Sequence, residues 1–233
     1  MTLEPISSRR TMQEAVYQQL SHALMTGHFD PGQMLTISAL AALFDTSHMP
    51  VREALRRLVA ENALEIASTG TAVVPTVNRQ RLDALCDARI IVEGAATELA
   101  TPKTDARLIR SLEHMADEHV EAYREKSVPT MLAKNQEFHF TIYRAAQSPV
   151  LFQLIETLWL RFGPYLRMLT EHLQPQLEAG DGESYTRHHF DIIDALKAGD
   201  AAAARRHMED DIRTTHALLQ TLYPSEESSA QSA

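Results

Sequence analysis

Apolar side chains recur at helical spacing in two short stretches on either side of the polar residues 45–47. The apolar positions are Ile37, Leu40, Ala41, Leu43 or Phe44, Val51, Ala54, Leu55, Leu58 and Val59. Thr36 stands where it can cap the first helix and Ser47 where it can cap the second. Pro50 is tolerated in the opening turn, whose N–H groups lack intrahelical partners. The pattern predicts two short helices around a tight turn that share one small core.

The second of these helices carries arginines on the side opposite its apolar residues. Arg52 and Arg56 are one turn apart, and Arg57 lies beside them. Guanidinium groups at such positions reach base edges or phosphates, so we expect Arg52 and Arg56 to read DNA and Arg57 to contact a phosphate. On these two helices alone, a solvated charged face is an equally good interpretation.

The flanking segments complete a winged helix. Residues 64–67 and 71–74 are short runs of strand formers around Ser68, Thr69 and Gly70, a turn in which glycine can take a positive φ. Upstream, an amphipathic pattern over 15–25 predicts a helix that stops at Gly27, and a turn at 30–32 leads into the helix pair. We therefore expect a winged helix-turn-helix DNA-binding domain over residues 1–77.

The composition is that of a globular protein with one large or two modest domains. The chain has 233 residues, of which 44% are hydrophobic, and Cys86 is its one cysteine, so it has no internal disulfide. It contains no apolar stretch of signal-peptide length and no run near the ~20 residues that cross a bilayer. These features predict a cytoplasmic protein without a membrane partner.

The net charge of −9 at first opposes DNA binding, which depends on neutralised phosphates. Residues 1–78 hold five basic and seven acidic side chains, so the expected DNA-binding domain itself has a net charge of −2. Its positive charge lies on one helix and on Arg9 and Arg10 near the start of the chain. Binding should therefore depend on a few placed contacts and on dimerisation rather than on a wide basic surface.

Beyond a boundary near residues 75–79, the chain shows one helical pattern after another and no convincing strand. Gly163 and Pro164 predict a kink, because proline removes a helical hydrogen bond. We predict an all-helical bundle over residues 78–223 and a disordered tail over 224–233, which makes the whole protein mainly α. The predicted helices span 81–100, 104–126, 128–146, 149–170, 182–198 and 200–222, with a loop over 174–182.

Four polar side chains of the bundle are spaced so that they converge. Asn135 and His139 are four residues apart and point the same way from one helix. His189 and Asp211 lie 10 and 11 residues on either side of the tight turn at 199–200, which puts them at matching heights on antiparallel helices. Together they are able to hold a divalent metal. A chain with 11 histidines also produces such pairs by chance, so histidines that only form hydrogen bonds are the alternative.

Three segments, ALMTGHFDPGQML, SHMPVREALRRLVAENALE and STGTAVV, resemble in order the signature of GntR-family transcription regulators, over residues 12–77. The resemblance implies that Arg52 reads DNA and that Gly70 lets the wing tip approach the minor groove. The chain departs from the family pattern at His48 and Met49, where Arg-Thr is usual, and at Ser38, where a charge is common. These departures predict a divergent operator or weaker affinity. The residues expected at DNA are Ser47, His48, Met49, Arg52, Arg56, Arg57, Thr69 and Gly70.

The segments NQEFHFTIYRAAQSPVL, LWLRFGPYLR and HFDIIDALKAGDAAAA resemble the FCD effector domain of the FadR-type branch of this family. The resemblance implies a bundle of six or seven helices that holds Zn²⁺ or a similar ion in its pocket. The family's ligands fall on Asn135, His139, His189 and Asp211, the last a carboxylate in place of a histidine. Oxygen ligands also suit other ions, so zinc is expected first, with Mn²⁺, Ni²⁺ or Mg²⁺ as alternatives. His207, one turn before Asp211, is the second choice for the fourth ligand.

The first predicted helix of the bundle carries DARIIVEGAATELA, which is similar to a segment in which the family's arginine faces the cavity and pairs with an effector carboxylate. The similarity implies that Arg89 and Glu93 lie at the effector site, and Tyr143 and Tyr165 are further candidates. The alternative is an intrahelical ion pair between Arg89 and Glu93, which contributes only about 0.3–0.5 kcal/mol if exposed.

These expectations describe a ligand-responsive transcription regulator rather than an enzyme. We expect a homodimer on pseudo-palindromic double-stranded DNA that represses a catabolic operon until a small organic acid binds. One alternative is a metal-dependent enzyme at the Asn135, His139, His189 and Asp211 site. No general base is identifiable for it, because Glu137 falls roughly 200° from Asn135 around the helix. Another alternative is a DNA-binding protein whose helical domain only dimerises.

Overall fold

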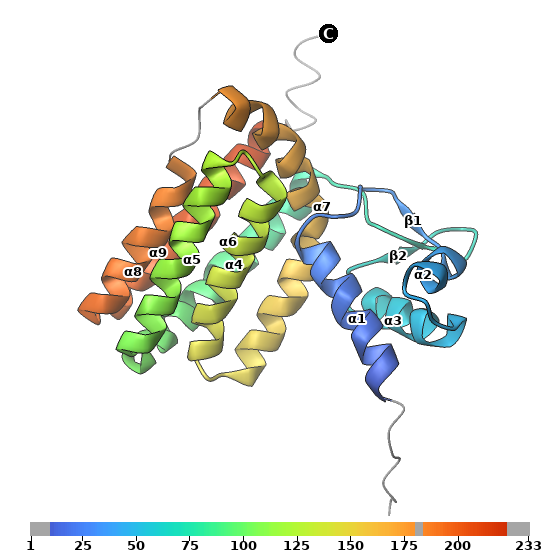
Figure 1. Cartoon of the computed structure of the whole chain (residues 1–233), viewed down its shortest axis with the longest axis horizontal. Helices are drawn as coiled ribbons and strands as arrows, with labels where there is room; N and C mark the ends of the chain where they lie inside the picture. Colours follow the sequence, from blue (N-terminus) through green and yellow to red (C-terminus); the bar gives the residue numbers. More distant parts are fainter. Residues whose placement is uncertain (1–9, 180–183, 223–233) are drawn as a thin grey trace, which may run out of the picture.

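The computed structural model describes residues 10–179 and 184–222, and it contains two parts that lie side by side (Figure 1). The first part is a winged helix, and the second is a bundle of long helices. Among the described residues, no helix is both long and apolar enough to cross a membrane. The fold is mainly α, as the sequence predicts, and its described strands all belong to the first part.

Three helices build the frame of the winged helix. α1 (Arg10–Met25) packs across α3 (His48–Ala60), and the short α2 (Ile37–Leu43) precedes α3 to form the helix-turn-helix. Thr36 caps α2 as predicted, because its side chain accepts a hydrogen bond from the N–H of Ala39 at 3.3 Å. The shared core is made by Val16, Leu20, Leu24, Leu40, Ala41, Val51, Ala54, Leu55 and Leu58.

Two details of the helix pair differ from the sequence prediction. Ser47 occupies the N-cap position of α3, but its side chain makes no capping hydrogen bond. Leu43 is 73% exposed, and the partly buried Phe44 packs against the core in its place. The choice between Leu43 and Phe44 depends on how α2 ends, since Phe44 is already its C-cap residue.

The wing is a three-stranded antiparallel sheet. β2 (Glu65–Ile66) and β3 (Ala72–Val73) form the predicted hairpin, and β3 also pairs with β1 (Met34–Leu35) in the order β1-β3-β2. Gly70 turns the hairpin with φ of +80°. A two-residue strand such as β1 is too short for alternation of polar and apolar side chains to predict it.

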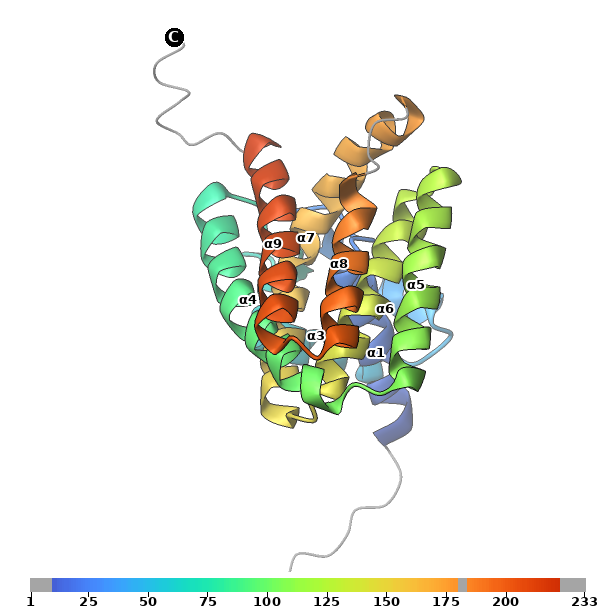
Figure 2. The same ribbon diagram turned by 90° about the vertical axis from the view of Figure 1, so that its left-hand side faces the viewer.

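Six long helices and one short turn of 3₁₀-helix make up the described part of the bundle. α9 lies between α4 and α8, and α5 packs on both α6 and α8 (Figure 2). Asn78 caps the first of these helices and Asp105 caps the second, each by accepting a backbone N–H three residues on. The elements are α4 (Arg79–Ala100), η1 (Thr101–Lys103), α5 (Ala106–Arg124), α6 (Val128–Ala145), α7 (Pro149–Ala179), α8 (Ser184–Ala198) and α9 (Ala201–Leu222).

The helix α7 is longer than predicted. It continues past Pro164 and Pro175 to Ala179, so residues 174–179 of the predicted loop are helical. Pro164 and its neighbours are buried, and this burial offsets the hydrogen bond that proline removes. The rest of the predicted loop, at 180–182, and the predicted tail at 224–233 lie outside the described residues.

The two parts meet where α1 and the turn that follows it pack against α7. A Cβ atom added to Gly163 would lie 2.1 Å from the carbonyl oxygen of Leu24, so only glycine permits this approach. The Tyr165 hydroxyl donates to the carbonyl of Asn78 at 2.9 Å, and Arg167 forms an ion pair with Asp30. α7 is therefore shared by the winged helix and the bundle.

Candidate functional site

The N-terminal half of α3 and the tip of the wing expose the side chains that the sequence assigns to DNA. Ser47, His48 and Met49 are exposed at the start of α3, and Thr69 and Gly70 are exposed at the wing tip. Between α3 and the wing lies a groove of about 560 Å³ whose lining residues include Arg52, Arg56, Gly70 and Thr71. The structure thus brings the predicted base-reading arginines and the wing glycine to one groove.

Arg57 has a different environment from Arg52 and Arg56. Its guanidinium stacks over the ring of Tyr17 at 3.5 Å and donates to Glu61 at 3.0 Å and to Glu14 at 3.1 Å. Burial and the hydrogen bond to Glu61 raise the pKa of Tyr17 to about 12, so the tyrosine stays neutral in this cluster. Arg57 thus links α3 to α1 through Glu14, while its side chain stays 45% exposed, and the phosphate contact remains a prediction.

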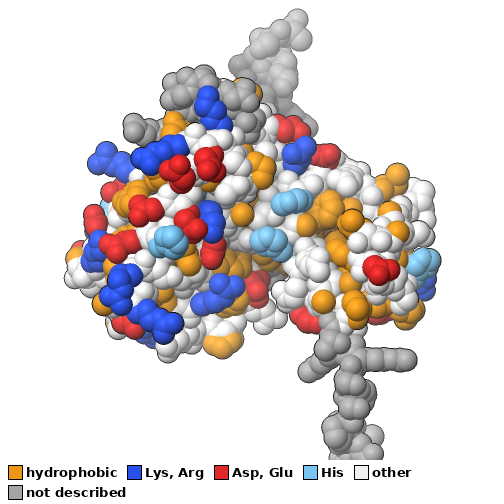
Figure 3. Space-filling view, viewed as in Figure 1, with side chains coloured by type: hydrophobic (Ala, Val, Ile, Leu, Met, Phe, Trp, Pro, Cys, Tyr) orange, Lys and Arg blue, Asp and Glu red, His pale blue; other side chains and the backbone are white. Residues whose placement is uncertain are grey.

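The charge distribution agrees with the count made from the sequence. On the face shown in Figure 3, acidic and basic side chains gather over the bundle, whereas few charged side chains lie on the winged helix. The winged helix shows no broad basic field on this face.

The four predicted metal ligands converge inside the bundle. His139 on α6 and Asp211 on α9 approach to 3.1 Å between Nε2 and Oδ2. His189 on α8 lies 3.0 Å from Asn135, measured from Nε2 to Oδ1. Donor atoms of His139, His189 and Asp211 all lie within 4.8 Å of one another. His207 is not part of this group among the described residues, so Asp211 is the ligand candidate on α9.

Hydrogen bonds behind His139 determine which of its nitrogens carries a proton. The Tyr143 hydroxyl has one proton and donates it to the carboxylate of Glu93. His139 Nδ1, 3.2 Å from the same hydroxyl, must then be the donor in that contact. In a neutral His139, this leaves a lone pair at Nε2 that faces the carboxylate oxygen of Asp211. Two lone pairs at 3.1 Å require a proton or a metal cation between them.

The electrostatics of the cluster suit a divalent cation. Burial lowers the pKa of His189 well below its ordinary value, which leaves a neutral imidazole. Burial alone would raise the pKa of Asp211, but the hydrogen bond and charge of His139 outweigh it and hold that pKa well below the usual range. Nδ1 of His189 is buried without a hydrogen-bond partner. Two imidazoles, a carboxylate and an amide oxygen are a donor set that fits zinc or a similar ion.

Arg89 lines the cavity next to this cluster and also forms the intrahelical ion pair with Glu93 that the sequence offered as the alternative. Arg89 Nε lies 2.6 Å from Glu93 Oε1. The guanidinium carbon Cζ lies over the rings of Trp159 and Phe162, 4.7 Å and 4.4 Å from their centroids. Both charged side chains are buried, at 6% and 0% exposure, so the small energy of an exposed pair does not apply. Removing one partner of a buried pair costs about 3–5 kcal/mol.

Two of the remaining effector candidates lie behind the cavity, and one lies elsewhere. Glu93 and Tyr143 form a second layer that orients Arg89 and His139. Tyr165 does not line the cavity, because its hydroxyl is bound to the backbone of Asn78 at the junction with the winged helix. The prediction of an effector contact at Tyr165 is therefore wrong. Glu137, which the sequence already places on another side of its helix from Asn135, is exposed and paired with Lys134 at 3.2 Å.

The cavity itself has a volume of about 50 Å³, room for a few water-sized groups. Its polar lining includes Arg89, Asn135 and Asp211, together with His119 and His188, which the sequence analysis missed. His188 lies 3.1 Å from the hydroxyl of Thr214. Burial lowers the pKa of His119 to about 4, so this imidazole is neutral at pH 7.

A signal for His119 was present in the sequence. On α5, the buried positions Leu112, Ala116 and His119 follow one another at spacings of four and three residues, so the histidine lies within the apolar stripe of an amphipathic helix. A histidine on the core side of a helix marks a candidate for a buried polar site. Spacing alone could not connect it with residues on α6, α8 and α9.

Comparison with known proteins agrees with both parts of the structure. Residues 12–74 match the gntR family of bacterial regulatory proteins, and residues 84–214 match the FCD domain. The HTH-type transcriptional regulator McbR of Escherichia coli (strain K12) is 31% identical over 208 residues, which cover 89% of this chain and 92% of McbR. The gluconate operon transcriptional repressor of Bacillus subtilis (strain 168) is 22% identical over 221 residues, 94% of this chain and 89% of the repressor.

A solved structure extends the likeness to three dimensions. The structure of E. coli McbR/YncC matches this chain with a TM-score of 0.85 and 29% sequence identity, over 94% of this chain and 100% of that one. Winged helix, bundle and their order along the chain are thus common to both proteins. The chain belongs to the GntR family of bacterial regulatory proteins, with an FCD domain behind its helix-turn-helix, and is a ligand-responsive, DNA-binding transcription regulator.

Proposed function

We propose that this regulator binds a divalent metal and a small carboxylate in the bundle and releases a repressed catabolic operon in response. The observation that carries the proposal is the contact between His139 Nε2 and Asp211 Oδ2 at 3.1 Å. With the Nδ1 proton of His139 directed to Tyr143, a cation between the two atoms removes the repulsion between their lone pairs. When bound, the metal supplies positive charge that an effector carboxylate can share.

The ligands of the metal are Asn135, His139, His189 and Asp211. Imidazoles favour Zn²⁺ and Ni²⁺, whereas the carboxylate and the amide oxygen also accept Mn²⁺ or Mg²⁺. Zinc is therefore the first candidate.

The effector is a small organic acid. Arg89 reaches the same cavity, and its planar guanidinium is suited to a carboxylate. Glu93 already neutralises this arginine, so the effector has to share it with Glu93. A cavity of about 50 Å³ favours an acid with few atoms beyond its carboxylate, or requires the bundle to open slightly.

The regulator acts as a homodimer with the domain limits 1–77 and 78–223. Two copies place their α3 helices in major grooves about one helical turn apart on a pseudo-palindromic operator. α4 exposes Ile91 by 63% and Leu99 by 47%, apolar side chains that a second copy would cover. The name of the B. subtilis relative, a gluconate operon repressor, supports repression as the mode of action.

α7 connects the ligand site with the DNA-binding part. Trp159 and Phe162 line the cavity, while Gly163 and Arg167, on the next residues of the same helix, contact the winged helix. A shift of α7 on ligand binding therefore moves the winged helix directly. The effector is expected to change the affinity for DNA, and DNA the affinity for the effector, by the same factor, typically about 5–150-fold.

The experiment has two measurements on one preparation purified without chelator. Elemental analysis determines the metal content, and selection from a random duplex pool, with and without Zn²⁺ and a panel of carboxylic acids, determines the operator. We expect close to one bound divalent ion per chain and an inverted repeat whose enrichment falls with one acid. Absence of metal, with no affinity on titration, would exclude the metal. An inverted repeat that no acid affects would exclude the carboxylate effector.

A further inference from the structure

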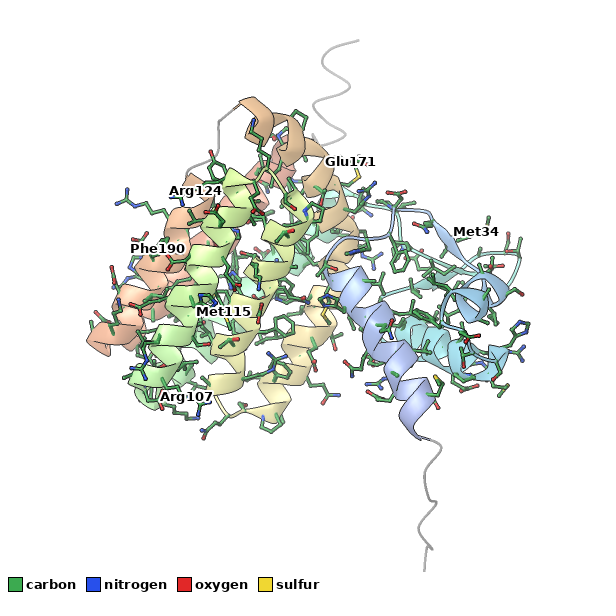
Figure 4. The ribbon with its side chains drawn as sticks, in the orientation of Figure 1. Met34, Arg107, Met115, Arg124, Glu171 and Phe190 are labelled. Atoms are coloured by element: carbon green, nitrogen blue, oxygen red, sulfur yellow. The ribbon has the colours of Figure 1, made fainter. Side chains whose placement is uncertain are left out.

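His119 is a buried imidazole. It does not belong to the predicted ligand set, and helix packing alone does not explain a polar side chain at this position. It lies one turn beyond Met115, which marks the middle of α5 in Figure 4, on the side that faces the bundle. The residue is 3% exposed and belongs to the lining of the same cavity as Asn135 and Asp211.

The surroundings of His119 leave one of its two ring nitrogens without a hydrogen bond. Its Nδ1 is buried and has no hydrogen-bond partner. A buried polar atom left unpaired costs about 1–3 kcal/mol, so packing alone is a poor reason for a histidine here. The neighbouring ring is that of His189, with 4.6 Å between the ring centroids, and the Nδ1 of His189 is likewise unpaired.

Two adjacent imidazoles with unpaired nitrogens, beside a carboxylate, have the composition of a cation site. An acceptor such as a carbonyl would satisfy N–H groups, but none of the described residues supplies one to either Nδ1. Phe138 stacks on the His189 ring with 4.1 Å between the ring centroids, and the rings of His119 and His139 lie 4.6 and 5.4 Å from it. His119 therefore adds a third imidazole to the surroundings of the cavity that Asp211 also lines.

We propose that His119 is an additional ligand of the divalent ion, so that the site contains three imidazoles from α5, α6 and α8. This inference rests on the proposed metal site. His119 stands beside, rather than within, the three donors that lie within 4.8 Å of one another, so the proposal requires its imidazole to turn toward the ion.

The additional ligand changes the selectivity of the site. Three imidazoles, a carboxylate and an amide oxygen favour Ni²⁺, Co²⁺ or Zn²⁺ over Mg²⁺ and Mn²⁺, which prefer oxygen ligands. The ion would also tie α5 to α6, α8 and α9, so its binding would stiffen the contacts among these four helices.

The test measures ligands directly on the full-length protein. X-ray absorption spectroscopy of the wild type loaded with Ni²⁺ alone counts the bound imidazoles. Affinities for Ni²⁺ and Mn²⁺ are then measured for the wild type, His119→Phe and His114→Phe. His114 is a matched control, because it lies on the same helix with its side chain 75% exposed.

We expect three imidazoles in the wild type and two in His119→Phe. Ni²⁺ affinity should fall more than about tenfold in His119→Phe, Mn²⁺ affinity should fall less, and His114→Phe should match the wild type. If His119→Phe fails to fold, as judged by circular dichroism, His119→Gln replaces it, and the wild-type count remains decisive.

The outcomes separate this inference from the proposed metal site. Two imidazoles in the wild type, or equal Ni²⁺ affinity with and without His119, overturn the role of His119 and leave the metal site standing. A wild type that binds neither Ni²⁺ nor Mn²⁺ overturns the metal site itself, and the inference with it.

Discussion

Arg52 and Arg57 lie on the same helix, five residues apart, and differ in what they contact. Arg52 is exposed beside the wing groove and has no ion pair among the described residues. Arg57 is stacked on Tyr17 and bound to two glutamates. At the scale of single residues, the number of partners inside the protein separates a side chain available to DNA from one that stabilises the fold.

This difference predicts opposite phenotypes for two alanine substitutions. Arg52→Ala should weaken binding to the selected operator by about 1–3 kcal/mol and leave the melting temperature unchanged, because the proposed contact to a base edge is lost while no contact inside the protein changes. Arg57→Ala should lower the free energy of unfolding by about 1 kcal/mol and affect DNA binding less, because a cation–π contact and two exposed ion pairs are lost. Fluorescence anisotropy at one salt concentration and thermal melts measure the two effects. Equal losses of operator affinity in both variants would contradict the assignment.

The junction of α4 and α9 shows how one side chain can join two helices. Asp83 on α4 accepts hydrogen bonds from Arg79 at 3.0 Å and Gln220 at 2.8 Å, and lies 2.7 Å from Nε2 of His216. Burial alone would raise the pKa of Asp83, but these partners, Gln220 and His216 foremost, outweigh it and lower that pKa. The ionised carboxylate is therefore the form that stabilises this pair of helices.

The lowered pKa predicts a pH-dependent contribution to stability. In the unfolded chain, the pKa of Asp83 is about 3.9, which is above its pKa in the folded protein. The contribution of Asp83 to the free energy of unfolding is therefore complete above about pH 3.9. It is lost as pH falls through the folded pKa. Asp83→Asn should cost about 1 kcal/mol at pH 7, and the difference from the wild type should shrink below about pH 4.

Urea denaturation of the two proteins across pH measures this difference. Asp194→Asn is the control, since Asp194 is 78% exposed and lies 3.6 Å from Lys197. Its effect should be small at every pH. A loss in Asp83→Asn that persists unchanged at low pH would mean that packing, rather than charge, joins the two helices.

The whole molecule depends on a close contact between α1 and α7. The Cβ position of Gly163 lies 2.1 Å from the Leu24 carbonyl, a backbone atom that cannot move alone. Gly94 on α4 is also buried, but its Cβ position lies 3.0 Å from the flexible side chain of Glu209. The same substitution, glycine to alanine, therefore introduces a clash with backbone at Gly163 and a clash with a movable side chain at Gly94.

Gly163→Ala should reduce the free energy of unfolding by about 1–3 kcal/mol and displace the winged helix from the bundle, because the backbones must separate. Gly94→Ala should be close to neutral, since the glutamate can move and alanine gains up to about 1 kcal/mol of helix propensity. Urea unfolding and small-angle X-ray scattering measure stability and domain placement. Indistinguishable variants would show that the contact does not constrain the two parts.

Much of the molecule follows from local patterns. Helical periodicity predicted α2, α3 and most of the bundle. The four donors were predicted from two relations: Asn135 and His139 are four residues apart on one helix, and His189 and Asp211 lie at nearly equal distances on either side of one tight turn. These relations hold within one helix or across one tight turn, where geometry is set by the chain itself. The structure differs from the predictions at the ends of helices and in the two-residue strand β1, where local sequence signals are weak.

What the sequence by itself determined is the family, the order of the elements and the predicted donors at the centre of the bundle. Only the tertiary structure decided the partners of individual side chains: Arg57 on Tyr17, Tyr165 at Asn78, and His119 beside His189. It also decided that α7 runs on to Ala179 and packs against α1. The physical reason is that periodicity assigns a side chain to a face of its helix, whereas its partner depends on which distant helix covers that face.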